Sequence, residues 1–232
     1  MRLWPDWPET RSFQLITRRE FIAGSSSLAI AAALFNVSDF GLIPSALAQG
    51  GPSAADLLAA GPLEEQSLGK EDAPVTVIEY ASMTCSHCAT FHIRTYPELK
   101  KRYIETGKVR YILREFPLDP LAAGAFMLAR CAGKDKYFPL VETLFQKQQE
   151  WVVNPPIPPL LALAKQAGFT EQTFNACLSD QKMLDGVQAV RDRGSQKFGV
   201  ESTPTFFING KKFSGAMTIE DMAKAIDPLI KS

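Results

Sequence analysis

The sequence predicts an α/β fold in which a long block of helices interrupts a small sheet. Two segments of strand character, Val75–Tyr80 and Val109–Phe116, flank a helical pattern. Residues 119–198 are helical almost throughout, and strand character returns at Thr205–Ile208. The expected order is therefore strand, helix, strand, a helical block, a hairpin and a final helix.

The composition fits one substantial globular domain and excludes several classes of protein. The chain has 232 residues, of which 46% are hydrophobic, enough to bury a sizeable core. Its 25 Lys and Arg residues balance 25 Asp and Glu residues, so no basic surplus indicates nucleic-acid binding. Fifteen Phe and three Trp residues exclude a disordered chain.

Residues 1–48 have the parts of a cleavable export signal. The pair Arg18-Arg19 precedes a mildly apolar run, Phe21–Phe35, and small residues end the segment at Ala48. The paired arginines resemble the twin-arginine type of signal, and an ordinary Sec signal is the alternative. The apolar run is shorter than the ~20 residues that a membrane-spanning helix needs. We expect an exported, periplasmic protein that is cleaved near Ala48.

The first half of the remaining chain holds the first two expected strands. Residues 49–72 are rich in Ala, Gly and Pro and are expected to form a flexible lead-in with one short helical patch, Ala54–Ala60. Val75–Tyr80 is β-branched and nearly all apolar, as expected of a strand buried on both faces. Pro97 lies inside the following helical pattern and predicts a kink. Val109–Phe116 is the second strand.

The second half consists of helices followed by a hairpin. Pro-rich residues 154–159 separate the helices, and Asn209-Gly210 predicts a hairpin turn from Thr205–Ile208 into Lys211–Ser214. Thr170, Ser179 and Thr218 are expected to cap helices. The expected helices are Leu121–Cys131, Tyr137–Trp151, Leu160–Ala167, Glu171–Leu178, a long helix reaching Phe198, and Ile219–Ile230.

The motif Cys85-Ser86-His87-Cys88 lies where the first strand meets the first helix. Unpaired amides and the helix dipole stabilise a thiolate there, which lowers a thiol pKa to between ~3.5 and 7.5. A polar His87 would add to this effect and make the disulfide a better oxidant. Redox chemistry is the favoured interpretation, and a static structural disulfide is the alternative.

Three blocks in this order resemble the DsbA-like thiol–disulfide oxidoreductases. They are Asp72–Tyr80 (DAPVTVIEY), Cys85–Cys88 (CSHC) and Ser202–Gly210 (STPTFFING). The resemblance covers about residues 70–232 and implies a thioredoxin fold with an all-helical insertion between an N-terminal βαβ part and a C-terminal ββα part. Its expected domain consists of residues 73–118 and 199–232, with the insertion at 119–198.

The resemblance also implies roles for individual residues. Cys85 is expected to be the attacking cysteine and Cys88 the buried resolving one. A cis peptide is expected at Thr203-Pro204, facing the disulfide and leaving the Thr203 backbone free to pair with an extended substrate. An ordinary strand-edge proline is the alternative for Pro204.

Glu79 lies inside the apolar strand, six residues before Cys85. A buried carboxylate is costly and is therefore a candidate for chemistry. The resembled family has an acid at this point, so we expect Glu79 to relay protons for Cys88. The alternative is a strand-end glutamate that reaches solvent.

Cys131 and Cys177 stand in two different expected helices, 46 positions apart. In an oxidising compartment two such cysteines usually pair, and on the chain-entropy model that loop stabilises the fold by ~4 kcal/mol. Some relatives in the resembled family have a second disulfide and others lack it. The alternative is two buried free thiols that pack as small apolar groups.

Metal binding is the competing chemistry for the motif. Cys85, Cys88 and His92 share one helix and could bind zinc with a water molecule, but no second cysteine pair exists to complete a structural site. We therefore expect no metal and no cofactor, with His92 partly exposed. Phe206, Phe207, Phe213 and Met217 could line a peptide groove, although strand spacing favours the core for at least half of them.

The expected function is an exported thiol–disulfide oxidoreductase that introduces disulfides into substrate proteins through Cys85–Cys88. Its expected partners are exported proteins with reduced cysteines and, as the resemblance implies, a quinone-linked membrane reoxidase. We expect a monomer. One alternative is an isomerase or reductase of the same fold that is kept reduced, which Thr203 before the proline favours. Another is a peptide-binding chaperone whose cysteines are incidental.

Overall fold

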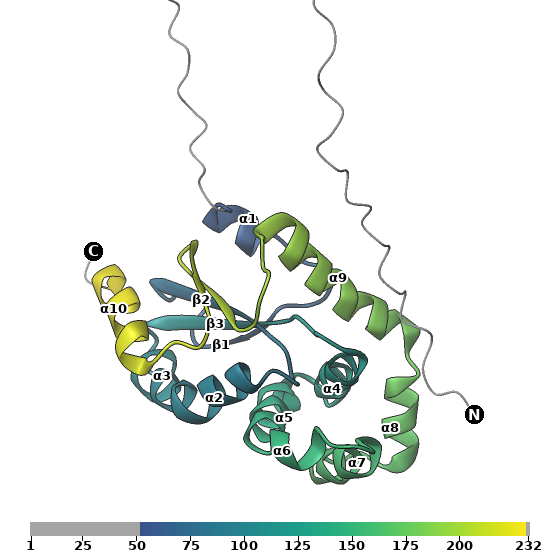
Figure 1. Ribbon diagram of the computed structural model, residues 1–232. Helices are drawn as coiled ribbons and strands as arrows, with labels where there is room; N and C mark the ends of the chain where they lie inside the picture. The colour runs from purple at the N-terminus through teal and green to yellow at the C-terminus, as the bar shows by residue number, and fades with distance from the viewer. Residues whose placement is uncertain (1–51, 231–232) are drawn as a thin grey trace, which may run out of the picture. The chain divides into compact units, whose positions relative to one another are not determined.

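The computed structural model describes residues 52–230, so the expected export signal and its cleavage site lie outside the described residues. The described part contains a five-stranded sheet in the order β1-β3-β2-β4-β5 (Figure 1). Strands β2 (Val75–Ala81) and β3 (Val109–Glu115) are parallel, as a helical crossover requires. Strands β4 (Thr205–Ile208) and β5 (Lys211–Ser214) form the expected antiparallel hairpin.

Residues 52–72 of the lead-in are part of the fold, which corrects the expectation of a flexible segment over this described part. It contributes α1 (Ala54–Leu58) and β1 (Gln66–Leu68), which pairs antiparallel with β3 at the edge of the sheet. The guanidinium of Arg114 donates to both carboxylate oxygens of Glu65, at 2.9 and 2.7 Å, and to the Leu57 carbonyl at 2.6 Å. One buried arginine therefore fixes two parts of this segment.

Helices in the described part follow the predicted order, but they differ from the prediction in where they are interrupted and where they begin. The first helical pattern is broken at Thr95 and continues through a short π-helical turn, which confirms the kink near Pro97. The expected helix Tyr137–Trp151 is two helices that meet at Lys147, and Asp180, rather than Ser179, caps α9. The helices are α2 (Ser86–Arg94), α3 (Tyr96–Leu99), η1 (Lys100–Ile104), α4 (Pro120–Cys131), α5 (Lys134–Gln146), α6 (Gln148–Trp151), α7 (Ile157–Gln166), α8 (Glu171–Leu178), α9 (Gln181–Phe198) and α10 (Ile219–Ile230).

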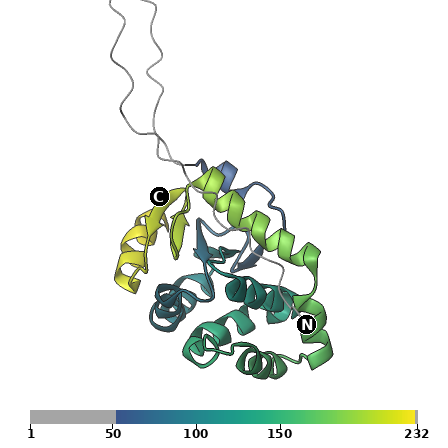
Figure 2. The same cartoon turned by 45° about the vertical axis from the view of Figure 1, so that its right-hand side comes forward.

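Helices cover both faces of the sheet and make two cores. Helices α1 and α9 lie over one face, and α2, α3 and α10 lie over the other (Figures 1 and 2). Side chains alternate along β2, so Ile78 and Tyr80 enter the core beneath α1 and α9, whereas Val77 faces the larger core that includes α2. Glu79 falls on the Val77 side of the strand. Alternation thus directs a carboxylate toward the helix that carries the cysteine motif.

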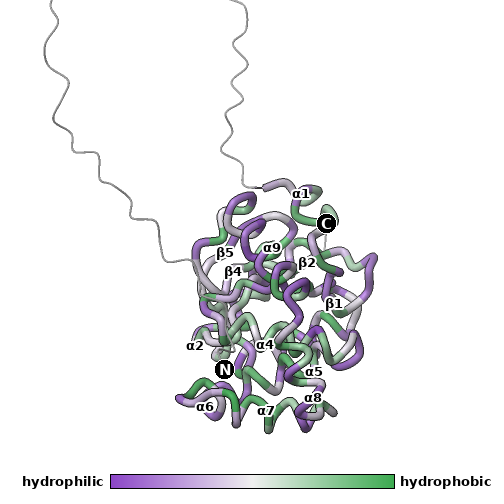
Figure 3. Tube along the Cα trace, turned by 90° about the vertical axis from the view of Figure 1, so that its right-hand side faces the viewer, coloured by the Kyte–Doolittle hydropathy of each residue, from purple (hydrophilic) through white to green (hydrophobic). Residues whose placement is uncertain are grey.

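The helical insertion extends the larger core. Figure 3 shows hydrophobic residues along α7, whereas β5 and α9 carry more hydrophilic ones. Cys131 at the end of α4 is disulfide-bonded to Cys177 in α8, which confirms the expected second disulfide. Phe206 and Phe207 are fully buried and belong to the core, whereas Phe213 and Met217 are half-buried against it.

Candidate active site

The cysteine motif lies at the predicted junction of strand and helix. Cys85 is the N-cap residue of α2 with an extended backbone, and its carbonyl accepts the first helical hydrogen bond, from Ala89 at 3.1 Å. Cys88 is buried in the first turn, while Cys85 is half-buried. Both cysteines carry free thiols, so the structure describes the reduced state.

The loop before β4 faces this motif. The Thr203-Pro204 peptide is cis, as expected. The Cys85 thiol donates to the carbonyl oxygen of Thr203 at 3.3 Å, although the two residues are 118 positions apart. Thr203 and Pro204 are both buried, and β4 begins directly after them. The fold therefore brings the two sequence blocks together around the Cys85 sulfur.

The two thiols differ strongly in acidity. A hydrogen bond from the Cys88 thiol, together with the backbone amides of Cys88 and His87, lowers the pKa of Cys85 to about 5 despite its partial burial. Burial raises the pKa of Cys88 well above its usual value, and the hydrogen bond to Cys85 and the charge of Glu79 raise it further. His87 is exposed, and its effect on the Cys85 pKa comes through its backbone amide.

This difference predicts the pH dependence of alkylation. We expect Cys85 to react with iodoacetamide as a thiolate, so its rate rises through pH 5 and is level above about pH 6.5. Cys88→Ala removes the strongest hydrogen bond to the sulfur and should move the midpoint toward higher pH. Alkylation rates followed by mass spectrometry test both statements. A wild-type midpoint near ~8.5, the value of a free cysteine, would contradict them.

Glu79 is completely buried, so the alternative of a glutamate reaching solvent is wrong. Its carboxylate oxygen Oε2 accepts a hydrogen bond from the Tyr111 hydroxyl on β3 and lies 3.2 Å from Nε2 of His92. His92 is only 3% exposed, which corrects the expectation that it is partly exposed. It follows Cys88 by one helical turn on the same buried face of α2.

The burial of His92 is relevant to the alternative interpretation of the motif as a zinc site. Within residues 52–230, no group of three or more His, Cys, Asp or Glu side chains is arranged to hold a metal ion. The histidine instead lies against the carboxylate of Glu79.

Gln148 is a site residue that the sequence did not reveal. Its side-chain amide is buried and donates to the carbonyls of Met83, at 2.8 Å, and Cys85, at 3.0 Å. The insertion thus holds the backbone on both sides of Thr84, directly before the helix. Gln148 lies in the polar run QKQQE, where no pattern distinguishes a buried glutamine from its exposed neighbours.

Removing this amide should destabilise the protein. Gln148→Ala leaves the buried Met83 carbonyl without its side-chain donor and removes one of the two donors to the Cys85 carbonyl, so we expect the free energy of unfolding to fall by about 1–3 kcal/mol. Gln149→Ala, an exposed neighbour on the same short helix, is the matched control and should change it by less than ~0.5 kcal/mol. Denaturant unfolding measures both values. Equal stability of the two variants would show that the amide contributes little.

Comparisons with known proteins agree with this geometry. Residues 63–228 match the family profile described as "Thioredoxin". A Rickettsia bellii protein named "Putative protein-disulfide oxidoreductase" is 36% identical over 71% of this chain, and the chain spans 64% of its length. Disulfide bond formation protein D of Bacillus subtilis is 29% identical over 71% of this chain and 76% of its own length.

Solved structures give the same class of protein. The crystal structure of Wolbachia pipientis alpha-DsbA1 matches with a TM-score of 0.71 and 32% identity, over 77% of this chain and 96% of that one. Oxidised BdbD of Bacillus subtilis matches with a TM-score of 0.64 and 25% identity, over 79% of this chain and 97% of that one. The chain belongs to the thioredoxin family and, within it, to the DsbA-like protein-disulfide oxidoreductases.

Proposed function

We propose that this protein is an exported dithiol oxidase that introduces disulfides into substrate proteins through Cys85 and Cys88. The observation that carries the proposal is the pair of unequal thiols. Cys85 is half-buried with its pKa lowered to about 5, next to a buried Cys88 with a raised pKa. A stable Cys85 thiolate favours the reduced enzyme, which makes the disulfide a strong oxidant.

The reaction starts from the Cys85–Cys88 disulfide. A substrate thiolate attacks the Cys85 sulfur, the bond between the two enzyme cysteines breaks, and Cys88 leaves as a thiolate that takes up a proton. A second substrate thiolate then attacks the substrate sulfur of the mixed disulfide. The substrate disulfide forms and Cys85 leaves with the electron pair. Its low pKa makes Cys85 a good leaving group and stabilises the product.

Four neighbouring residues have proposed roles in this reaction. Thr203 and Pro204 face the Cys85 sulfur, where the backbone of this loop would pair with an extended substrate. Glu79 would relay the proton of Cys88, since its charge acts on that thiol. The backbone amide of His87 helps to stabilise the thiolate, and its exposed side chain would contact the substrate.

The proposed location is the periplasm. The signal-like pattern of residues 1–48 supports export, and the Cys131–Cys177 disulfide suits an oxidising compartment. Within residues 52–230, no helix has both the length and the apolar character needed to cross a bilayer. A quinone-linked membrane protein would reoxidise the enzyme, which we propose acts as a monomer.

The rival function is that of an isomerase or reductase of the same fold. A threonine directly before the cis-proline favours it, because the family resemblance associates threonine at this position with isomerase-like members as well. A reduced peptide with two cysteines and a protein with scrambled disulfides distinguish the two functions. We expect the oxidised enzyme to close the peptide disulfide stoichiometrically and to reshuffle the scrambled protein slowly. Rapid reshuffling without oxidation of the peptide would favour the isomerase.

A further inference from the structure

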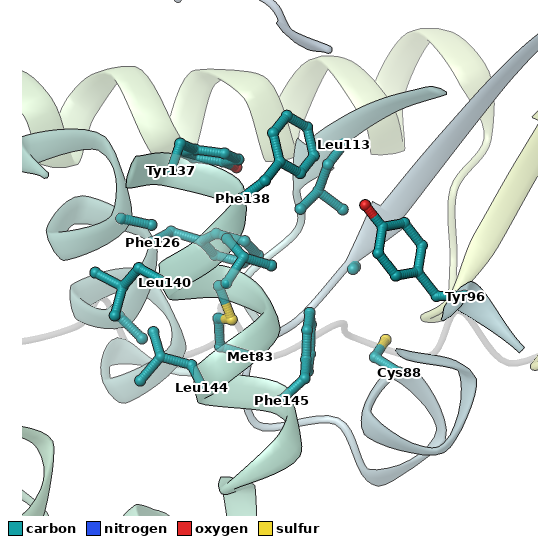
Figure 4. Close-up of a cluster of buried hydrophobic side chains, with 14 of the residues drawn as sticks. Met83, Cys88, Tyr96, Leu113, Phe126, Tyr137, Phe138, Leu140, Leu144 and Phe145 are labelled. Carbon is teal, nitrogen blue, oxygen red and sulfur yellow. The ribbon is translucent and has the colours of Figure 1, made fainter. Parts of the chain in front are cut away.

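His92 has no part in the reaction described above, yet it lies directly behind the active-site helix turn. It shares the buried face of α2 with Cys88, and its Nε2 atom lies 3.2 Å from Oε2 of Glu79. The two side chains are 1% and 0% exposed. Cys88 and the aromatic side chains of Tyr96 and Phe145 belong to the same part of the core (Figure 4).

The surroundings of His92 are aromatic and offer few polar partners. Its ring stacks on Phe145 with centroids 4.1 Å apart, and Tyr96 and Phe91 lie at 4.9 and 5.4 Å. Neither nitrogen of His92 makes an aligned hydrogen bond, and Oε1 of Glu79 has no hydrogen-bond partner. A buried polar group left unpaired costs about 1–3 kcal/mol. Unpaired polar atoms of this kind, in Glu79 and His92 next to the resolving cysteine Cys88, require a chemical explanation.

The titratable groups that face this pair come from four elements. Tyr111 on β3 donates to Glu79, and Cys88 on α2 lies within the electrostatic reach of Glu79. Burial and the charges of Glu142 on α5 and Glu79 raise the pKa of Tyr96, which keeps that phenol neutral. Tyr111 is held neutral in the same way, by burial first and by the charge of Glu79 second. Among the described residues around Glu79, the imidazole of His92 is therefore the basic group in direct contact with its carboxylate.

We propose that Glu79 and His92 act as a proton-holding pair, which takes the proton of Cys88 when this thiol attacks the mixed disulfide and returns it when the disulfide is reduced. His92 is the positioning residue of the pair, because it acts on Cys88 through Glu79. This inference rests on the proposed function and deepens it. His92 is the group of opposite charge type that lies against this fully buried carboxylate, and a buried charge without such a partner is costly.

The step balances with glutathione disulfide as the oxidant. Cys85 thiolate first attacks glutathione disulfide, forming a mixed disulfide and releasing one glutathione thiolate. Cys88 then gives its proton to the pair and its sulfur bonds to that of Cys85. The bond between Cys85 and glutathione breaks, and the second glutathione leaves with the electron pair and takes a proton from water. The two enzyme thiols are oxidised and one glutathione disulfide is reduced.

Stopped-flow oxidation of the reduced protein by glutathione disulfide separates these two steps. The first rate depends on glutathione disulfide concentration and the second does not. At pH 7 we expect His92→Phe to slow the second step at least ~10-fold and to move its pH profile toward higher pH. The first step should stay within about twofold, because the hydrogen bonds to Cys85 do not involve His92.

Arg94→Gln, an exposed change two residues later in α2, is the matched control and should alter neither step. If His92→Phe does not fold, His92→Gln tests the same step with a polar side chain at this position. A folded variant with the wild-type second rate and pH profile would overturn the inference and leave the proposed function intact. Equal slowing at every pH would also overturn it, since that indicates a structural role. A wild-type protein that never completes the second step would overturn both.

Discussion

Cys85→Ser should abolish disulfide exchange, whereas Cys88→Ser should trap substrates covalently. Serine cannot form a disulfide, so the first variant has no site for a substrate thiolate to attack. In the second variant Cys85 remains half-buried next to the Thr203 carbonyl and can still form a mixed disulfide. No resolving thiol is then present to release it. We expect complete loss of peptide oxidation in both variants and stable substrate complexes only in the second.

Non-reducing electrophoresis with a single-cysteine peptide disulfide as the probe measures the trapped species, and unfolding curves show that both variants are folded. The comparison also distinguishes an oxidoreductase from a peptide-binding chaperone. The two variants differ only in which cysteine of the same helical turn is replaced by serine, so a chaperone with incidental cysteines should respond to both in the same way. Full activity of Cys85→Ser would mean that the cysteines are incidental to function.

Removing the second disulfide should have the largest effect on stability. Cys131 and Cys177 are 46 positions apart with their Cα atoms at 6.2 Å, and they connect α4 to α8 within the insertion. Closing such a loop restricts the unfolded chain by ~4 kcal/mol on the chain-entropy model. We expect the double variant Cys131→Ala, Cys177→Ala to lose about that much free energy of unfolding.

Denaturant unfolding of the oxidised protein, with Cys85→Ser, Cys88→Ser as the control that keeps only this disulfide, isolates the effect. A loss below ~1 kcal/mol would show that the folded insertion holds α4 and α8 together without the bond, or that the unfolded chain is already compact there.

The cysteine motif could be predicted from local sequence, and the cis-proline loop from the resemblance of its sequence block to the DsbA-like family. The motif follows a β-branched strand and begins a helix, and STPTFFING contains the proline, the next strand and the turn in nine residues. Side-chain alternation in β2 also explains Glu79, since a residue two after Val77 must face the same core.

The missed features depend on contacts between distant segments. Strand β1 consists of three half-buried residues whose partners in β3 lie 43 to 47 positions later, so no periodicity marks it. Gln148 is buried only because α6 packs beside the cysteine turn, some sixty residues earlier in the chain. His92 could have been placed from its spacing of one turn after Cys88. Its partner Glu79 and its stacking on Phe145 required the packed core.

The most direct test of an oxidase is the reduction potential of the Cys85–Cys88 disulfide. The protein would be equilibrated in a series of glutathione buffers, with Cys131 and Cys177 followed separately by alkylation and mass. The stabilised Cys85 thiolate predicts a value near ~−120 mV, that of a strong oxidant whose reduced form is the stable one. A value at or below ~−200 mV would contradict the oxidase and indicate a protein held reduced, as an isomerase or reductase is.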